Sequence, residues 1–442
     1  MTATTVLPAR VRRGYGLGSV ATGTFGTVPG LLLLPYLTDT LGVAAALAGV
    51  IVFAPKAWDV VLNPVAGRIS DTSTHPAGRR RPFLLRGGLV LAACFALLFA
   101  GPTSTVAGAI WVVVLFTGCA TAYAFFQVPY VAMPAELTLD YDERTRLMTW
   151  RVAVLALAIL LSGATAPMVV DAVGHDSPAG YRLMGVYVAA ILVIGVLGAW
   201  WGTRGAPEHW VDTPGGGIAG QVRLVAEAAD FRPLLVTFVL QALGIGTMLA
   251  GVAYAADDVL DAASAATILF AAFVGPALVV TPLWERYARA RTKRSGYVLS
   301  TVVMVAGMLV IGAFLPAVPA VAYAGAALVG VGYAGAQVFP MAMLPDVAAR
   351  DAERTGQNRI GVFTGVWTAG ETLGLALGPA LFALVLALGG YASSSAGEDV
   401  AQSDGARLAI RLGFTIVPAA LTAVSLLALR GYRLDEEVRG VR

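Results

Sequence analysis

Residues Lys56 to Phe83 read KAWDVVLNPVAGRISDTSTHPAGRRRPF and combine a membrane-spanning pattern with buried charge. The stretch begins inside residues 47–69, an otherwise apolar run long enough to cross the roughly 30 Å hydrocarbon core of a bilayer, and it then enters an arginine-rich turn. Lys56, Asp59 and Asn63 are three and four residues apart, so they share one face of the expected helix. Charges at membrane depth normally face a bundle interior or a watery cavity and mark a pathway. The alternative is a purely structural ion pair between Lys56 and Asp59.

The composition is that of an integral membrane protein. Of the 442 residues, 57% are hydrophobic and 13% are charged, with a mean hydropathy of +0.76, whereas a soluble domain carries about 25% charged residues. Arg12 and Arg13 precede an apolar run too long for a signal peptide, so the first helix should be retained. Cys94 and Cys119 lie in apolar runs and imply neither a disulfide nor a metal framework. We expect no metal, cofactor or nucleic-acid partner, and a monomer in the lipid bilayer.

Apolar runs of roughly 20 residues predict about twelve spanning helices and therefore an all-α membrane protein. Between the sixth and seventh runs, the chain is polar and contains three consecutive glycines, which predicts a flexible linker. We expect an N-terminal six-helix half at residues 1–203, a cytoplasmic linker at 204–231, and a C-terminal six-helix half with a short tail at 232–442. The predicted helices cover residues 15–37, 44–69, 83–100, 106–135, 147–170, 183–201, 234–255, 264–284, 297–315, 321–344, 360–388 and 408–429.

The distribution of basic residues predicts the orientation. Alternate loops contain no Lys or Arg, whereas the remaining loops carry many, including Arg79 to Arg81, Arg144 and Arg350. Basic loops face the cytoplasm. Both termini are therefore expected in the cytoplasm of a multi-pass inner (plasma) membrane protein.

An internal repeat relates the two predicted halves. The fourth run contains YAFFQVPYVAM followed by ERT, and the tenth contains YAGAQVFPMAM followed by ERT. The copies align without a gap, because Gln337 is numbered 210 above Gln127 and Arg354 is numbered 210 above Arg144. Six spans separate the copies, so both ERT segments fall on the same side of the membrane. This pattern indicates a parallel repeat of two six-helix halves.

Three segments carry a family resemblance: WDVVLNPVAGRISD with GRRRPF, VPYVAMPAELTLDYDERTRL, and PMAMLPDVAARDAERTGQNRIGVFTGVWTAGETLGLALG. They resemble the glycoside–pentoside–hexuronide:cation symporter family, the melibiose-carrier-like branch of the major facilitator superfamily, which also includes lysophospholipid transporters. The resemblance covers nearly the whole chain. It implies the major facilitator fold and secondary active transport by alternating access.

The resemblance also implies a cation site, with two acids four residues apart on the second helix and one on the fourth. Asp59 keeps its carboxylate, but Asn63 and Gln127 place neutral amides at the other two positions, so we expect weak sodium binding. The sugar-binding acid of the galactoside transporters falls at about Gly23 and is missing. The family's eleventh-helix lysine falls at Glu371. A galactoside substrate is therefore not supported, whereas the transport architecture is.

Glu371 is a second acid at membrane depth. Apolar surroundings disfavour the charged form of a carboxyl group, which makes Glu371 a candidate proton carrier. The alternative is an ion pair between Glu371 and Lys56 across the halves. We expect Asp59, Asn63 and Glu371 to couple transport to a cation, with H⁺ favoured over Na⁺.

Other polar residues are candidates for the solute site and for a conformational gate. Gln337 could equally form a hydrogen bond between helices, and Arg151, implied by the resemblance, could equally anchor at the membrane interface. Cytoplasmic ion pairs are expected to hold the halves in one state, each worth about 0–1 kcal/mol. The solute-binding candidates are Lys56, Gln127, Arg151, Gln337 and Trp367, and the gate candidates are Asp71, Arg79, Arg80, Arg81, Glu143, Arg144, Glu353 and Arg354.

The leading interpretation is cation-coupled symport of an organic solute such as a sugar or glycoside. An alternative keeps the fold and moves or exports a lipid-like, hydrophobic or amphiphilic solute. An enzyme is not expected, because the sequence shows no nucleophile–base pair, no metal-ligand spacing and no phosphate-binding loop.

Overall fold

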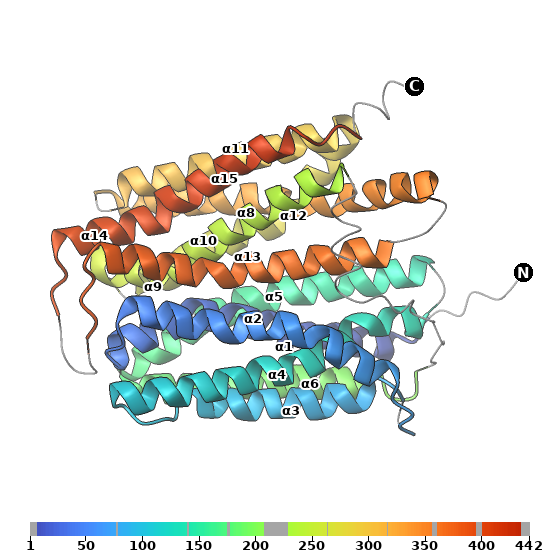
Figure 1. Ribbon diagram of the computed structural model, residues 1–442, viewed down its shortest axis with the longest axis horizontal. Helices are drawn as coiled ribbons and strands as arrows, with labels where there is room; N and C mark the ends of the chain where they lie inside the picture. Colours follow the sequence, from blue (N-terminus) through green and yellow to red (C-terminus); the bar gives the residue numbers. More distant parts are fainter. Residues whose placement is uncertain are drawn as a thin grey trace, which may run out of the picture. The chain divides into compact units, whose positions relative to one another are not determined.

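The computed structural model describes residues 7–76, 78–138, 141–174, 177–206, 229–262, 264–315, 317–355, 360–394 and 400–434. Within these ranges, 12 helical stretches are long and apolar enough to cross a membrane, and the described elements are all helical (Figure 1). The predicted all-α membrane fold is confirmed. The polar segment expected as a linker lies mostly outside the described residues.

The first compact unit comprises Met1–Pro214 with Ser393–Val400. In this unit α1 packs against α5 and α6, α3 packs against α4 and α6, and α2 packs against α4. Its elements are α1 (Ala9–Pro35), the π-helical turn η1 (Tyr36–Thr40), α2 (Ala45–Asp71), α3 (Arg81–Leu98), α4 (Thr105–Leu137), α5 (Tyr141–Val173) and α6 (Pro178–Gly202).

The second compact unit comprises Gly215–Ala392 with Ala401–Arg442. Here α8 packs against α13 and α15, α11 packs against α12 and α15, and α10 packs against α12. Each pair has its counterpart in the first unit, as a repeat requires. The elements are α8 (Phe231–Ala250), α9 (Val252–Tyr254), η2 (Ala255–Val259), α10 (Ser264–Ala290), α11 (Lys293–Phe314), α12 (Pro319–Thr355), α13 (Ile360–Leu388), α14 (Asp404–Arg411), η3 (Leu412–Ile416) and α15 (Val417–Leu429).

The repeat extends to the side-chain environment of α4 and α12. Gln127 and Gln337 are both half-buried, and four residues later Val131 and Met341 are both exposed. The two helices therefore present equivalent faces to their own units, which confirms the pseudo-symmetry inferred from the 210-residue offset.

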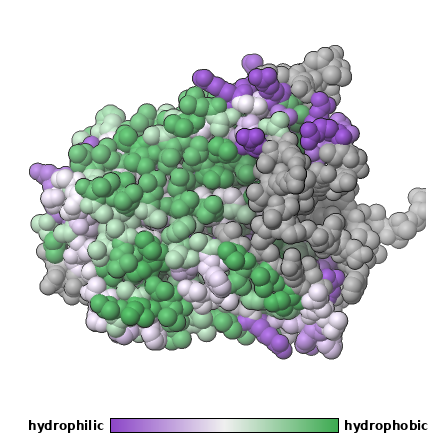
Figure 2. Space-filling view, in the orientation of Figure 1, coloured by the Kyte–Doolittle hydropathy of each residue, from purple (hydrophilic) through white to green (hydrophobic). Residues whose placement is uncertain are grey.

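Apolar side chains cover the outer faces of the helices. Figure 2 shows hydrophobic residues over the middle of the helices and hydrophilic ones toward their ends. Large apolar residues such as Val106, Val279 and Leu388 are 72%, 75% and 81% exposed. A soluble protein would not tolerate such extended apolar surface, whereas lipid is its natural solvent.

Small residues allow the closest helix contacts. A Cβ atom on Gly14 of α1 would lie 2.3 Å from the Cα of Gly202 on α6, and one on Gly378 of α13 would lie 2.3 Å from the carbonyl carbon of Gly246 on α8. Without an apolar driving force between helices in lipid, close backbone packing of this kind supplies much of the association energy.

Several helices extend beyond their predicted apolar runs, among them α5 and α12. α5 begins at Tyr141 and α12 continues to Thr355, so the charged segments around both ERT sequences are helical. The charged residues lie outside the apolar part of the span, but the helix continues through them. Backbone hydrogen bonds of a helix form in lipid and in water alike.

Candidate functional site

The polar face of α2 lies within the first unit. Asp59 is 5% exposed, and Lys56 and Asn63 are half-buried. The Oδ1 atoms of Asp59 and Asn63 are buried and accept no hydrogen bond from the described part of the chain. Two acceptor oxygens about one helical turn apart are therefore open on one helix face.

α4, which packs against α2, supplies a third open acceptor. Gln127 Oε1 is buried and has no hydrogen-bond partner among the described residues. Buried polar atoms are nearly always hydrogen-bonded, so unpartnered ones call for an explanation. Three open oxygens on two packed helices suit a ligand that donates hydrogen bonds or carries positive charge.

Lys56 is seated on aromatic rings. Its Nζ lies 5.0 Å from the centroid of the Phe25 ring and 6.0 Å from that of Phe116. Among the described side chains, no salt bridge joins Lys56 to Asp59. The faces of aromatic rings attract cations. The structure therefore favours cation–π interactions of Lys56 with these rings over a direct ion pair with Asp59.

Arg151 lies on α5, ten residues after Tyr141, or ~15 Å along the helix from its start. Its guanidinium carbon is 5.5 Å from the centroid of the Tyr130 ring, and its Nε is buried and has no hydrogen-bond partner in the described part of the chain. The Tyr130 hydroxyl donates to the carbonyl oxygen of Tyr15 at 2.8 Å and lies 2.9 Å from Ser19 Oγ. Contacts with α1 therefore fix the ring that holds Arg151.

Tyr123 lies near Asp59 and Arg151 in the first unit. It lies on α4 within electrostatic range of both Asp59 and Arg151, and its ring is 4.6 Å from that of Phe25. Sequence reasoning used Tyr123 only to align the repeat. Its position four residues before Gln127, on the same helix face, was the available signal.

Gly23, the position of the missing sugar-binding acid, lies in a helix contact. A Cβ atom there would be 3.1 Å from the carbonyl oxygen of Leu155 and 3.2 Å from Ala158 Cβ on α5. A side chain at this position would require α1 or α5 to shift by a few tenths of an ångström.

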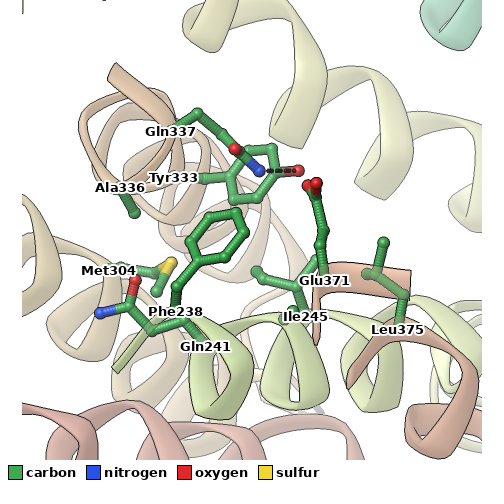
Figure 3. Close-up of a pocket in the computed structure, with 10 residues that line it drawn as sticks. Phe238, Gln241, Ile245, Met304, Tyr333, Ala336, Gln337, Glu371 and Leu375 are labelled. Atoms are coloured by element: carbon green, nitrogen blue, oxygen red, sulfur yellow. Dashed lines mark hydrogen bonds between the residues drawn. The ribbon is translucent and has the colours of Figure 1, made fainter. Parts of the chain in front are cut away.

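Glu371 lies in a pocket of the second unit formed by α8, α11, α12 and α13. Gln337 Nε2 donates to the Tyr333 hydroxyl at 2.7 Å, and the Glu371 carboxylate points toward that hydroxyl (Figure 3). The cavity has room for about one water molecule. Glu371 forms no salt bridge among the described residues.

Gln241, on the opposite wall of this pocket, is fully hydrogen-bonded. Its Nε2 donates to Thr301 Oγ1 and Ser425 Oγ, both at 3.1 Å, and its Oε1 accepts from the Tyr297 hydroxyl at 3.0 Å. The amide thus joins α8, α11 and α15. Sequence reasoning missed Gln241 because a lone amide in an apolar run has no local signal of its partners.

Trp367 lies in the core of the second unit. Its side chain is 0% exposed and stacks on Phe238, with ring centroids 4.2 Å apart. A solute could contact this indole only after the surrounding helices moved.

Ion pairs join helix ends within each unit at the arginine-rich end. Arg80 Nε and Nη2 both contact Glu136 Oε1 at 2.9 Å, and Nη1 donates to Ser70 Oγ at 2.6 Å. In the second unit, Lys293 pairs with Asp346, which is numbered 210 above Glu136. The repeat therefore conserves the acid and its role between the two copies.

The other gate candidates have mostly local partners. Arg81 Nη2 donates to the Ala206 carbonyl oxygen at 2.7 Å. Glu353 pairs with Arg350 at 3.8 Å, and Arg354 pairs with Asp351 at 3.6 Å, both within α12. The Arg79 side chain also interacts with its surroundings. The side chains of Asp71, Glu143 and Arg144 lie outside the described set.

Comparison with known proteins identifies related sequences and folds. The family described as MFS/sugar transport protein matches residues 14–436. YagG of Escherichia coli (strain K12), provisionally named a glycoside/cation symporter, is 25% identical over 98% of this chain and 93% of its own. An uncharacterized symporter of Synechocystis is 25% identical over 92% of this chain and 90% of its own. A bacterial homolog of the human lysosomal transporter Spinster, in an inward-facing conformation, superposes with a TM-score of 0.68 at 15% identity, covering 97% of this chain and 96% of its own.

Proposed function

Because the chain belongs to the family of MFS/sugar transport proteins, we propose that it moves an organic solute, such as a sugar or glycoside, together with a cation. It is a multi-pass membrane transporter and not an enzyme. The name of the Escherichia coli relative, a glycoside/cation symporter, supports this choice. Alternating access of a site to the two sides of the membrane would couple the two fluxes.

The placement of Glu371 carries the proposal of proton coupling. This carboxyl group lies in a small pocket beside Tyr333 and Gln337, and no described cation pairs with it. An unpaired carboxylate is costly in such surroundings, so a proton that binds and leaves during the cycle would relieve the cost. Asp59 is the second acid available, with Asn63 beside it.

A sodium-coupled variant is the second candidate, and the open oxygens of the first unit favour it. Asp59 Oδ1, Asn63 Oδ1 and Gln127 Oε1 all accept no hydrogen bond from the residues that the structure describes. Carboxylate and amide oxygens suit a hard cation, although a single charge among them would bind it weakly.

Uptake into proteoliposomes distinguishes the two ions. A solute is first found by ligand-dependent thermal stabilisation in a panel of sugars, glycosides and lysolipids. We expect a proton gradient directed inward, with the outside more acidic, to accelerate uptake of the solute. Glu371→Gln should abolish that acceleration. Uptake driven by a sodium gradient at fixed pH, and lost in Asp59→Asn but not in Glu371→Gln, would favour the sodium variant.

An apolar pocket favours a third possibility for the cargo, a lipid-like solute. Apolar residues line it, among them Leu269, Phe270 and Phe414, and Ile245 lies on both this pocket and that of Glu371. Stabilisation by lysolipids but not by glycosides in the same panel would select this cargo.

The same proposal includes an orientation and a gate. The arginine-rich helix ends and both termini would face the cytoplasm. Ion pairs among Asp71, Arg79 to Arg81, Glu143, Arg144, Glu353 and Arg354 would bias the conformational equilibrium there. Lys56, Gln127, Arg151, Gln337 and Trp367 would contact the solute at one stage of the cycle.

A further inference from the structure

The two cysteines of the chain meet on neighbouring helices of the first unit. Cys94 lies on α3 and Cys119 lies on α4, 25 residues apart in sequence. Both are free thiols, and their side chains are hydrogen-bonded to each other. A Cβ atom added to Gly118 would lie 3.4 Å from Cys94 Sγ, so this sulfur reaches the surface of α4. Their spacing in sequence predicts no metal site, whereas the fold brings the two sulfurs together.

Close packing of α3 on α4 holds the thiol pair from both sides along the helices. Toward the arginine-rich end, a Cβ atom on Gly87 would lie 3.1 Å from the carbonyl carbon of Phe125, so the two backbones are in contact there. Toward the other end, Trp111 Nε1 donates to the carbonyl oxygen of Leu97 at 2.8 Å. The two sulfurs are therefore placed by the helix packing itself, and a ligand that binds both would not have to order the chain first.

The pair is accessible on one side and lies near a cation on the other. Cys94 is half-buried, whereas Cys119 is 0% exposed, so an ion would approach from the side of Cys94. Lys56 of α2 interacts electrostatically with Cys119 and also with Asp59. Metals bind the thiolate rather than the thiol, and a neighbouring ammonium group stabilises a thiolate. The surroundings of Cys119 therefore suit a sulfur that loses its proton to a metal ion.

The number and kind of ligands decide which ion fits. Among the described residues, no group of three or more His, Cys, Asp or Glu side chains could hold a metal ion. Structural zinc takes four ligands, and hard cations take about six oxygens, so neither suits two sulfurs. Soft thiolates select Cu(I), which accepts two ligands. Metal–thiolate bonds are about 2.3 Å long, so one ion spans at most about 4.6 Å between two sulfurs, and hydrogen-bonded thiols are already close to that separation.

We propose that Cys94 and Cys119 form a two-coordinate site for a soft monovalent metal ion, Cu(I). On binding, each thiol releases its proton and each sulfur forms one bond to the ion. One Cu(I) thus replaces two protons, and no electron is transferred. The bound ion would link α3 to α4 beside Lys56. The inference is independent of the proposed function, because neither a solute nor the coupling ion takes part in it.

Titration of the reduced protein with soft metal ions tests the site. The purified full-length chain in nanodiscs, free of oxygen and chloride, is titrated with Ag⁺, a redox-inert substitute for Cu(I). Ultraviolet absorption of the metal–thiolate bonds and the release of protons are followed together. We expect one Ag⁺ per chain and the release of two protons, and we expect the chain to withdraw one Cu(I) from a chromophoric chelator. Two independent ions per chain, or no uptake of Cu(I) from the chelator, overturns the inference.

Three variants show whether both sulfurs bind the same ion. Cys94→Ser and Cys119→Ser each leave one thiol, and loss of the second ligand should weaken Ag⁺ binding by at least about 100-fold. Thr117→Cys combined with Cys119→Thr keeps two cysteines but moves one thiol to another face of α4, so it should bind no more tightly than the single-thiol variants. Thermal unfolding confirms that each variant is folded, and Cys94→Ser, at the half-buried position, serves if Cys119 variants unfold. Unchanged affinity in folded Cys94→Ser, or full affinity in the displaced pair, contradicts the assignment.

Discussion

Tyr333 has a hydroxyl group whose hydrogen-bonding capacity is only half used. It accepts a hydrogen bond from Gln337 Nε2, so its own proton is directed elsewhere, and the Glu371 carboxylate points toward it (Figure 3). A hydroxyl donor stabilises a neighbouring carboxylate more than it stabilises the neutral acid. The Tyr333 hydroxyl is therefore placed to donate a hydrogen bond to Glu371, the proposed proton carrier.

The substitution Tyr333→Phe should shift the pH dependence of uptake. Loss of the donor makes the charged form of Glu371 less favourable, so the proton is held more tightly and the pH of half-maximal uptake should rise. Tyr323→Phe, ten residues earlier on α12, is the matched control. A pH profile that is unchanged in Tyr333→Phe, with normal folding, would exclude this role.

Sequence alone predicted the acids better than their surroundings. Asp59 and Glu371 could be identified because a charged residue in a spanning helix normally faces the interior of the helix bundle or a watery cavity. Trp367 could not be placed, because an indole in a spanning helix suits lipid, core and cavity alike, and only packing against Phe238 decides. Tyr333 was predictable in principle from its four-residue spacing to Gln337.

At the scale of elements, the two repeat-related ion pairs differ in burial. The side chains of Arg80 and Glu136 are 6% and 7% exposed, whereas those of Lys293 and Asp346 are 33% and 38% exposed. A buried charge left without its partner costs about 3–5 kcal/mol, whereas a partly solvated pair contributes about 0–1 kcal/mol.

Glu136→Gln should therefore destabilise the protein by about 3 kcal/mol, and Asp346→Asn by less than about 1 kcal/mol. The measurement is reversible unfolding of each variant in detergent micelles. Equal losses in the two variants would mean that burial does not decide the strength of these pairs.

The amide of Gln241 should be a stability determinant rather than a transport residue. Gln241→Leu removes the three hydrogen bonds of this amide with Thr301, Ser425 and the Tyr297 hydroxyl. Hydrogen bonds between membrane helices average about 0.6 kcal/mol each, so a loss of about 1–2 kcal/mol is expected. Gln337→Leu, which removes one hydrogen bond at a half-buried position, should lower uptake more than stability. The opposite ranking in unfolding and uptake assays would reverse the two roles.

Helix positions followed from hydropathy, whereas the ion pairs between helices did not. The 210-residue repeat predicted that α4 and α12 present equivalent faces, since both copies pack against equivalent helices of their own unit. It did not reveal the partner of Arg80, because Glu136 lies 56 residues away and no local pattern joins them. Pairing of this kind depends on how the helix ends meet.

For the whole molecule, orientation is open to a labelling test. In a background without Cys94 and Cys119, cysteines replace Thr74, in the arginine-rich turn, and Ser104, in a loop without Lys or Arg; both positions are exposed. A membrane-impermeant maleimide should label Ser104→Cys in intact cells and Thr74→Cys only after lysis. Labelling of Thr74→Cys alone in intact cells would invert the proposed topology.

Proton coupling through Glu371 is tested by the proton flux that accompanies solute movement. Addition of the identified solute to weakly buffered proteoliposomes should make the external medium alkaline, because protons enter with the solute. Glu371→Gln should exchange labelled for unlabelled solute at a normal rate while the alkalinisation disappears. Alkalinisation of wild-type size in Glu371→Gln, or none in the wild type during active uptake, would contradict proton coupling through Glu371.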